Sequence, residues 1–238
     1  MTPQPADSRI RFYDSIATEF DEIMNPYDLK RRLETVFEGL LEGESLQGLR
    51  VLDVGCGTGE FSLLARRWGA DVTALDIGYR LLEVTKRKGI RTPILGDALA
   101  LPFRNESFDL VLSSECIEHT TDGFRAVEEM MRVLRRDGRL VLTCPNRCWR
   151  WLIVSATRLG IRPYGGIEDP PSWNTLERWI TKAGGRTVFH HGLHALPFQL
   201  PFAEKLLPRL DRLLSPLERF FINQCLLARK PGARGIGD

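Results

Sequence analysis

The sequence predicts an α/β fold with a Rossmann-like, mostly parallel sheet of seven strands, helices on both faces and an N-terminal helical cap. Three observations support this. Short apolar runs alternate with helical stretches between residues 49 and 143, the first run ends in closely spaced glycines, and a long insertion separates the last two runs. Alternating strands and helices form parallel βαβ units. The insertion predicts an antiparallel edge strand.

Length and composition are those of one ordinary globular domain. The 238 residues are 43% hydrophobic and 27% charged, which allows a core without disulfides or metals. The formal net charge of +2 gives no reason to expect a nucleic-acid partner. No apolar stretch approaches the roughly 20 residues of a membrane span, and the N-terminus lacks the pattern of a secretory signal. An odd number of cysteines, five, predicts reduced thiols in a cytoplasmic protein.

The N-terminal region is expected to be a flexible tail over residues 1–8 and a helical cap over residues 9–41. Apolar residues at helical spacing predict the cap helices, with a break at Asn25–Pro26. A cap ahead of the first strand is placed to exclude water from a site. The basic run Lys30–Arg32 is interpreted as a solvated helix face, with contact to a cofactor carboxylate as the alternative.

The rest of the chain is divided into a cofactor-binding core and a substrate-side part of the same domain. The core, residues 42–146, is expected to contain strands at 49–54, 71–76, 93–95, 108–113 and 139–143 and helices at 59–68, 80–88 and 123–136. Residues 147–230 are expected to contain helices at 147–160, 175–183 and 197–216 and strands at 186–191 and 221–229. Residues 231–238 are expected to be a second flexible tail.

The strongest chemical signal is the strand–turn–helix segment from Val51 to Gly59. Gly55, Gly57 and Gly59 follow the buried strand at alternate positions, where glycine lets the backbone turn sharply and lets a ligand approach it. Asp76 ends the next strand, where a carboxylate can accept hydrogen bonds from both ribose hydroxyls. The pattern predicts a nucleoside cofactor at the carboxyl ends of the strands.

The residues around the glycines favour S-adenosylmethionine over a nicotinamide dinucleotide. A dinucleotide fingerprint places its third glycine one position later than Gly59, where this chain has Glu60. Carboxylates at Asp53 and Glu60 would repel a pyrophosphate and attract a ligand with an amino group and a sulfonium. A nicotinamide-dependent oxidoreductase and a regulator that binds the cofactor without turnover remain as alternatives.

Residues 53–146, about two fifths of the chain, resemble the class I S-adenosylmethionine-dependent methyltransferases. The matching motifs are Leu52–Gly59, Asp76, Gly96–Ala98, Pro102–Phe103, Ser107–Val111, Glu118–His119 and Arg135–Leu140. The resemblance implies that the cofactor contacts Asp53, Gly55, Cys56, Gly57, Gly59, Asp76, Ile77, Asp97, Ala98 and Ser114. In detail, it implies that the glycines line the methionine moiety, Asp76 binds the ribose, and Ile77 packs on the adenine. Asp97 and the Ala98 amide would bind the adenine edge, and Ser114 or Glu115 would face the sulfonium.

The chain is similar in particular to the ubiquinone-biosynthesis type of O-methyltransferase and related small-molecule enzymes. This similarity lies in Asn25–Pro26, in Gly69–Asp76 and in the Glu115-x-x-Glu118-His119 motif. The segment Trp149–Pro171 and the proline-rich stretch after His194 depart from that group. The expected reaction is O-methylation of a hydroxyl on a small, partly apolar acceptor, with N- or C-methylation of a secondary metabolite as the alternative.

Glu115, Glu118 and His119 share a helical spacing, which places them on one face if the chain is helical there. One hypothesis is that they bind a divalent metal such as Mg²⁺, with His190, His191 or His194 as a further ligand, and so acidify a substrate hydroxyl. The other is that His119 acts as a general base and Glu118 orients its imidazole. The second is favoured, because the spacing alone brings no downstream histidine to ligand distance.

The leucines within residues 197–220 repeat at helical spacing. Such a stripe packs on a sheet or a second subunit, or makes peripheral contact with a membrane or an amphipathic acceptor. The sequence does not decide between these roles, and it predicts no oligomeric state.

Overall fold

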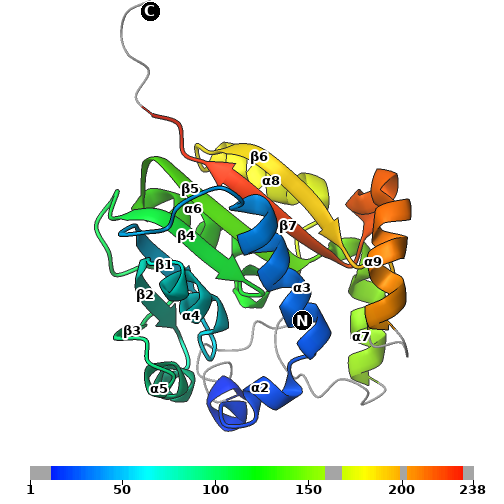
Figure 1. Cartoon of the computed structure of the whole chain (residues 1–238), viewed down its shortest axis with the longest axis horizontal. Helices are drawn as coiled ribbons and strands as arrows, with labels where there is room; N and C mark the ends of the chain where they lie inside the picture. Colours follow the sequence, from blue (N-terminus) through cyan, green and yellow to red (C-terminus); the bar gives the residue numbers. More distant parts are fainter. Residues whose placement is uncertain (1–11, 159–167, 199–202, 233–238) are drawn as a thin grey trace, which may run out of the picture.

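The computed structural model describes residues 12–158, 168–198 and 203–232, which build one seven-stranded sheet between two layers of helices (Figure 1). The strands are β1 (Arg50–Val54), β2 (Asp71–Asp76), β3 (Thr92–Leu95), β4 (Phe108–Ser114), β5 (Leu134–Pro145), β6 (Arg186–Leu193) and β7 (Asn223–Arg229). Their order is β3-β2-β1-β4-β5-β7-β6. All neighbours are parallel except β7, which pairs antiparallel with β5 and β6. The predicted mostly parallel sheet with antiparallel pairing at one edge is confirmed.

The helices follow the predicted positions closely. They are α2 (Phe20–Ile23), α3 (Pro26–Leu33), η1 (Glu34–Leu40), α4 (Glu60–Arg67), α5 (Tyr79–Arg87), η2 (Ile117–His119), α6 (Gly123–Val133), η3 (Arg147–Trp149), α7 (Arg150–Arg158), α8 (Trp173–Lys182), α9 (Ala203–Leu213) and η4 (Ser215–Phe220). The expected break in the cap is present, because the Asn25 side chain accepts a hydrogen bond from the Asp28 amide and Pro26 opens α3.

Alternate residues of each strand pack against opposite helical layers, as the two-residue period of a strand requires. Leu52 belongs to the cluster that contains Met130 of α6 and Ile180 of α8. Its neighbour Val51 belongs to the cluster that contains Phe37 of η1 and residues of α4. Both faces of the sheet are therefore covered, and the N-terminal helices share the core of the sheet. The boundaries drawn from the sequence at residues 41 and 146 stay predictions.

Two expected helices are shorter than predicted. The helix at 123–136 ends at Val133, because Leu134 is extended and pairs with Phe108, so that β5 starts five residues early. The helix at 197–216 is confined to α9, and η4 follows as a separate 3-10 turn. The expected tail 1–8, residues 233–238 of the expected tail 231–238, and parts of the segments near 160 and 200 lie outside the described residues.

Within the described ranges, none of the helices has the length and apolar character needed to cross a membrane. All five cysteines lie in these ranges and are free thiols, as the odd number predicted.

Candidate active site

The turn after β1 is built from glycines with left-handed backbone. Gly55, Gly57 and Gly59 have φ angles of 71°, 54° and 89°, which side-chain-bearing residues rarely adopt. A Cβ on Gly59 would lie 2.9 Å from Thr85 Cγ2, and one on Gly55 would overlap Cys116 Sγ. Residues with a side chain are therefore excluded from Gly55 and Gly59, because Cys116 and Thr85 pack directly against the turn.

Asp76 lies at the end of β2 with its carboxylate directed at the same turn. Oδ2 accepts a hydrogen bond from the Gly57 amide at 2.9 Å and Oδ1 from the Gly78 amide at 2.8 Å. Each oxygen keeps a further lone pair for a ribose hydroxyl. Burial raises the pKa of this carboxyl, and the backbone amides act against that rise. The residues therefore fit the nucleoside of the expected cofactor, with half-buried Ile77 next to them.

The two carboxylates expected to repel a pyrophosphate are both compensated. Asp53 is 1% exposed and accepts a 2.6 Å hydrogen bond from Ser62 Oγ, and burial raises its pKa to about 7. Glu60 pairs with Lys88 Nζ at 2.7 Å. The charge argument against a dinucleotide is therefore weaker than the sequence indicated. Cys56, next to the glycines, stays a thiol, because burial raises its pKa well above the usual value.

The loop after β3 carries Asp97 and Ala98, the residues expected at the adenine. Asp97 Oδ1 accepts a hydrogen bond from the Leu99 amide at 2.9 Å, and Ala98 is buried. The loop therefore meets the turns after β1 and β2 at one edge of the sheet.

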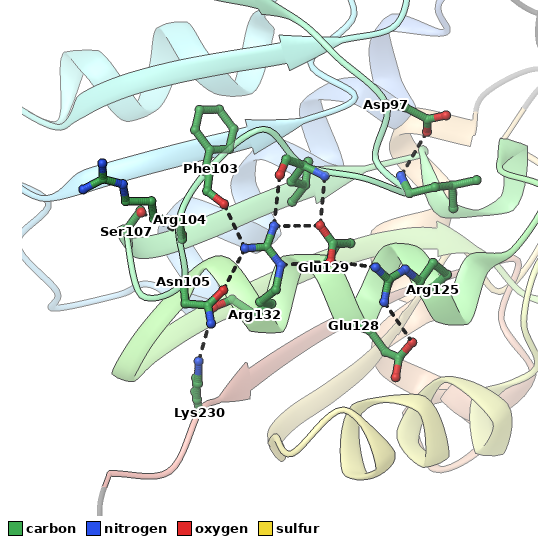
Figure 2. A network of polar contacts seen from close by, with 12 residues as sticks. Asp97, Phe103, Arg104, Asn105, Ser107, Arg125, Glu128, Glu129, Arg132 and Lys230 are labelled. Carbon is green, nitrogen blue, oxygen red and sulfur yellow. Dashed lines mark hydrogen bonds and ion pairs between the residues drawn. The ribbon is translucent and has the colours of Figure 1, made fainter.

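Two residues of α6 hold this loop in place (Figure 2). Glu129 Oε2 accepts a hydrogen bond from the Leu101 amide at 2.9 Å. Arg132 donates to the carbonyls of Leu101 and Phe103 at 2.9 and 2.8 Å, and its guanidinium lies 2.7 Å from Glu129. The pair satisfies backbone groups that a loop otherwise leaves to water. Neither residue was predicted from the sequence to belong to the site. The only sequence feature that connects them is their opposite charge at i, i+3 spacing on a helix.

The expected helical face after β4 does not form. Glu115 has a left-handed φ of 53°, and only η2 follows, so the three side chains do not share a face. Glu118 is 1% exposed, and neither carboxyl oxygen has a hydrogen-bond partner among the described residues. Burial, with Glu115 beside it, raises the pKa of Glu118 well above its usual value. His119 Nε2 lies 3.8 Å from Glu118 Oε1, too far for the expected orienting hydrogen bond.

The proposed metal ligands are not brought together. In the ranges that the structure describes, no group of three or more His, Cys, Asp or Glu side chains could hold a metal ion. His190, His191 and His194 bond to three different acids, Glu177, Glu218 and Asp28. The residues present do not fit a metal site, and the expectation of one is not supported.

Arg32 corrects the interpretation of the basic run as a solvated face. Its side chain is 2% exposed, whereas that of Lys30 is 73% exposed. Arg32 Nη1 donates to Ser114 Oγ at 2.7 Å, and Nε and Nη2 contact Asp28 Oδ2 at 3.0 and 2.9 Å. Ser114 Oγ in turn lies 2.7 Å from Thr143 Oγ1. The arginine therefore ties α3 to the ends of β4 and β5, beside the expected sulfonium end of the cofactor.

Asp28 connects this arginine to the far edge of the sheet. Its Oδ1 lies 2.9 Å from His194 Nε2 and accepts from Asn223 Nδ2 at 3.3 Å. Burial opposes ionisation, but Arg32 and His194 hold the pKa of Asp28 below its usual range, so it is a carboxylate. These residues lie 166 and 195 positions from Asp28 in the chain. The sequence contained only one signal of the cluster, the i, i+4 spacing of Asp28 and Arg32.

The N-terminal helices close over the nucleoside side of the site. The ring of Phe20 lies 3.3 Å from the position of a Cβ on Gly57, and the Arg80 amide donates to Asp14 Oδ1 at 2.9 Å. The ring of Tyr13 stands edge-on to His119 with 6.1 Å between centroids. The cap therefore covers this side of the site, and its role in excluding water stays a prediction.

Comparison with known proteins identifies the family. A family model described as a methyltransferase domain matches residues 52–142. The chain is 37% identical over 216 residues to a demethylmenaquinone methyltransferase of Renibacterium salmoninarum, covering 76% of this chain and 88% of that protein. It is 26% identical to a ubiquinone biosynthesis O-methyltransferase of Proteus mirabilis, over 84% of this chain and 86% of that protein.

Solved structures share the fold. A magnesium protoporphyrin IX methyltransferase from Synechocystis with bound SAH superposes with a TM-score of 0.67 at 17% identity, over 92% of this chain and 97% of that one. An S-adenosylmethionine-dependent methyltransferase from Mesorhizobium loti gives 0.65 at 20% identity, over 83% and 97%. With the glycine turn, the ribose-directed carboxylate and these relatives in agreement, the chain belongs to the S-adenosylmethionine-dependent methyltransferases.

Proposed function

We propose that this enzyme methylates a hydroxyl group of a small, partly apolar acceptor. The observation that carries the proposal is the meeting of two different sets of groups at one sheet edge. The glycine turn, Asp76 and Asp97 lie at the ends of β1, β2 and β3. The buried cluster around Arg32 and Asp28 begins at the end of β4. A donor site and an acceptor site therefore adjoin at Ser114.

The donor site would hold the cofactor through residues at the ends of β1, β2 and β3. The main chain at the three glycines would receive the methionine moiety, Asp76 the ribose hydroxyls, and Ile77, Asp97 and Ala98 the adenine. When bound, S-adenosylmethionine supplies a methyl group on a sulfonium, which is electrophilic and is transferred by in-line displacement. The cap excludes water from this region, and Glu129 and Arg132 keep the adenine loop in its bound shape before binding.

His119 is the residue proposed to take the acceptor proton. An attacking hydroxyl becomes a better nucleophile as it loses its proton, and an imidazole accepts protons near neutral pH. The His119 side chain is 16% exposed and lies in the turn that follows β4. Glu118 is buried in the same turn and, at 3.8 Å from the ring, does not orient the imidazole.

Methylation of a quinone ring is a second candidate, and the demethylmenaquinone methyltransferase among the relatives favours it. Such an acceptor would carry an apolar tail. Leu206, Leu213 and Leu217 are 53%, 75% and 53% exposed on α9 and η4 and are available to contact a tail or a membrane surface. A cytoplasmic location is part of this proposal.

Turnover with isotopically labelled methyl donor tests the function. The wild-type enzyme is expected to transfer label to hydroxylated aromatic rings such as catechols and quinols, and product NMR distinguishes O- from C-methylation. His119→Ala should lower kcat by about 10²–10⁴-fold, the usual contribution of a general base, without changing cofactor affinity. His191→Ala is the matched control, because that side chain is 50% exposed. Full turnover by His119→Ala would remove the base role, and transfer to no hydroxyl or ring carbon would remove the function.

A further inference from the structure

Three buried polar atoms without partners gather where α3, α9 and the end of β6 meet. They are Tyr27 Oη, His194 Nδ1 and Asp211 Oδ2, and none has a hydrogen-bond partner in the part of the chain that the structure describes. The rings of Tyr27 and His194 lie 5.6 Å apart between centroids, and the charge of Asp211 acts on the pKa of Tyr27. Buried polar groups are nearly always hydrogen-bonded, so a cluster of orphans indicates that a partner is missing.

His194 is held in a defined state by its neighbours. Its Nε2 lies 2.9 Å from the ionised Asp28, which can only accept, so Nε2 carries a hydrogen, and in the neutral imidazole Nδ1 then carries the lone pair. The imidazole is fully buried, and Asp28 is fixed by Arg32 and Asn223. His194 also has a φ of 64°, a conformation that is uncommon outside glycine and concentrates at functional sites. In the neutral ring the orphan nitrogen is therefore an acceptor, held in place by three other residues, Asp28, Arg32 and Asn223, and by a strained backbone.

The residues around these atoms indicate which chemical group the missing partner carries. Burial raises the pKa of Tyr27, so its hydroxyl keeps the hydrogen and can donate it. The missing partner must donate a hydrogen bond to His194 Nδ1 and accept one from Tyr27 Oη. A hydroxyl is the simplest group that does both. The walls are apolar, because the Phe198 ring lies 4.8 Å from that of His194 and Leu207 is 2% exposed.

We propose that Tyr27 and His194 bind a second hydroxyl of the acceptor, on an aromatic or similarly apolar ring, which is not the hydroxyl that is methylated. Arg32 and Asp28 link the two places, because the Arg32 guanidinium contacts both Ser114 and Asp28, and Asp28 contacts His194. The acceptor class is thus a ring with at least two hydroxyls, one near Ser114 and His119 and one near His194. This assignment rests on the proposed O-methylation.

Titration with phenol, observed by NMR of the histidine rings, tests the site in the enzyme saturated with S-adenosylhomocysteine. Benzene is the matched probe without the hydroxyl. Tyr27→Phe removes only the orphan oxygen, and His194→Gln keeps a donor for Asp28 while removing the Nδ1 acceptor. Tyr79→Phe is the control variant, because Tyr79 is 57% exposed on α5.

We expect phenol to bind wild type and Tyr79→Phe equally and to shift the His194 resonances. Its dissociation constant should rise about tenfold in Tyr27→Phe and in His194→Gln, the effect of one hydrogen bond, while that of benzene changes less than about twofold. The Tm of Tyr27→Phe should not fall, because the lost oxygen bonds to no described residue.

Three results would overturn the assignment: no phenol binding by wild type, equal affinity for phenol and benzene, or phenol binding that Tyr27→Phe leaves unchanged. If His194→Gln does not fold, the phenol affinity of Tyr27→Phe is sufficient to test the assignment. The titration needs no turnover, and methylation of hydroxyls is measured separately. A failure of methylation would therefore reject the proposed function and is distinguishable from each of these three results.

Discussion

The two halves of the catalytic sheet edge are built in different ways. In the donor half, at the ends of β1, β2 and β3, the key side chains bond mainly to nearby main chain, as Asp76 does to Gly57 and Gly78. In the acceptor half, side chains bond to one another across the fold, as Asp28 does to Arg32 and His194. The comparison teaches that the proposed cofactor site is encoded locally, whereas the proposed acceptor site exists only after the chain has folded.

The pKa values of the buried carboxyls also shift in opposite directions in the two halves. Burial raises the pKa of both Asp53 and Asp76 in the donor half. In the acceptor half burial acts the same way on Asp28, but Arg32 and His194 outweigh it and lower the pKa. Burial therefore opposes ionisation in both halves, and in the acceptor half a buried ion pair compensates it.

The largest expected effect comes from breaking that ion pair. Arg32→Leu leaves the Asp28 carboxylate without its main partner, and loss of one member of a buried pair costs about 3–5 kcal/mol of stability. Arg31→Leu is the adjacent control; its side chain is 27% exposed and pairs only with Glu34 among the described acids, so we expect a loss of about 1 kcal/mol or less. Urea unfolding measures both. Equal losses would show that Arg32 is not the residue that compensates Asp28.

The same contrast explains which parts were predictable. The glycine turn and Asp76 lie within 22 consecutive residues, Gly55–Asp76, and their spacing alone placed them at one edge. The strands were predictable because apolar runs alternate with helices. Arg32 was misjudged because a charged run on a helix usually faces water, and only the tertiary position of Ser114 shows otherwise. The prediction that Glu115, Glu118 and His119 share one helical face was wrong, because Glu115 adopts a left-handed backbone that residue spacing does not reveal.

A second prediction uses pH to separate the halves. The native pKa of Asp53 is about 7 against an ordinary 3.8, so the unfolded chain loses this proton first as pH rises. Asp53 therefore stabilises the native state least above about pH 7. The free energy of unfolding of Asp53→Asn, relative to that of wild type, should therefore rise by roughly 3 kcal/mol from about pH 4 to about pH 8. Asp71→Asn, an exposed position on β2, should show no such trend, and parallel curves for Asp53→Asn and wild type would contradict the raised pKa.

The most direct test of the division between the halves is titration calorimetry with S-adenosylhomocysteine. Asp76→Ala should bind it about thirtyfold more weakly, about 2 kcal/mol, because two ribose hydroxyls lose a charged acceptor. Asp71→Ala at the other end of β2 and Tyr27→Phe in the acceptor half should bind it as wild type does. Unchanged affinity in folded Asp76→Ala, or equal weakening by Tyr27→Phe, would contradict a donor site formed by the ends of β1, β2 and β3.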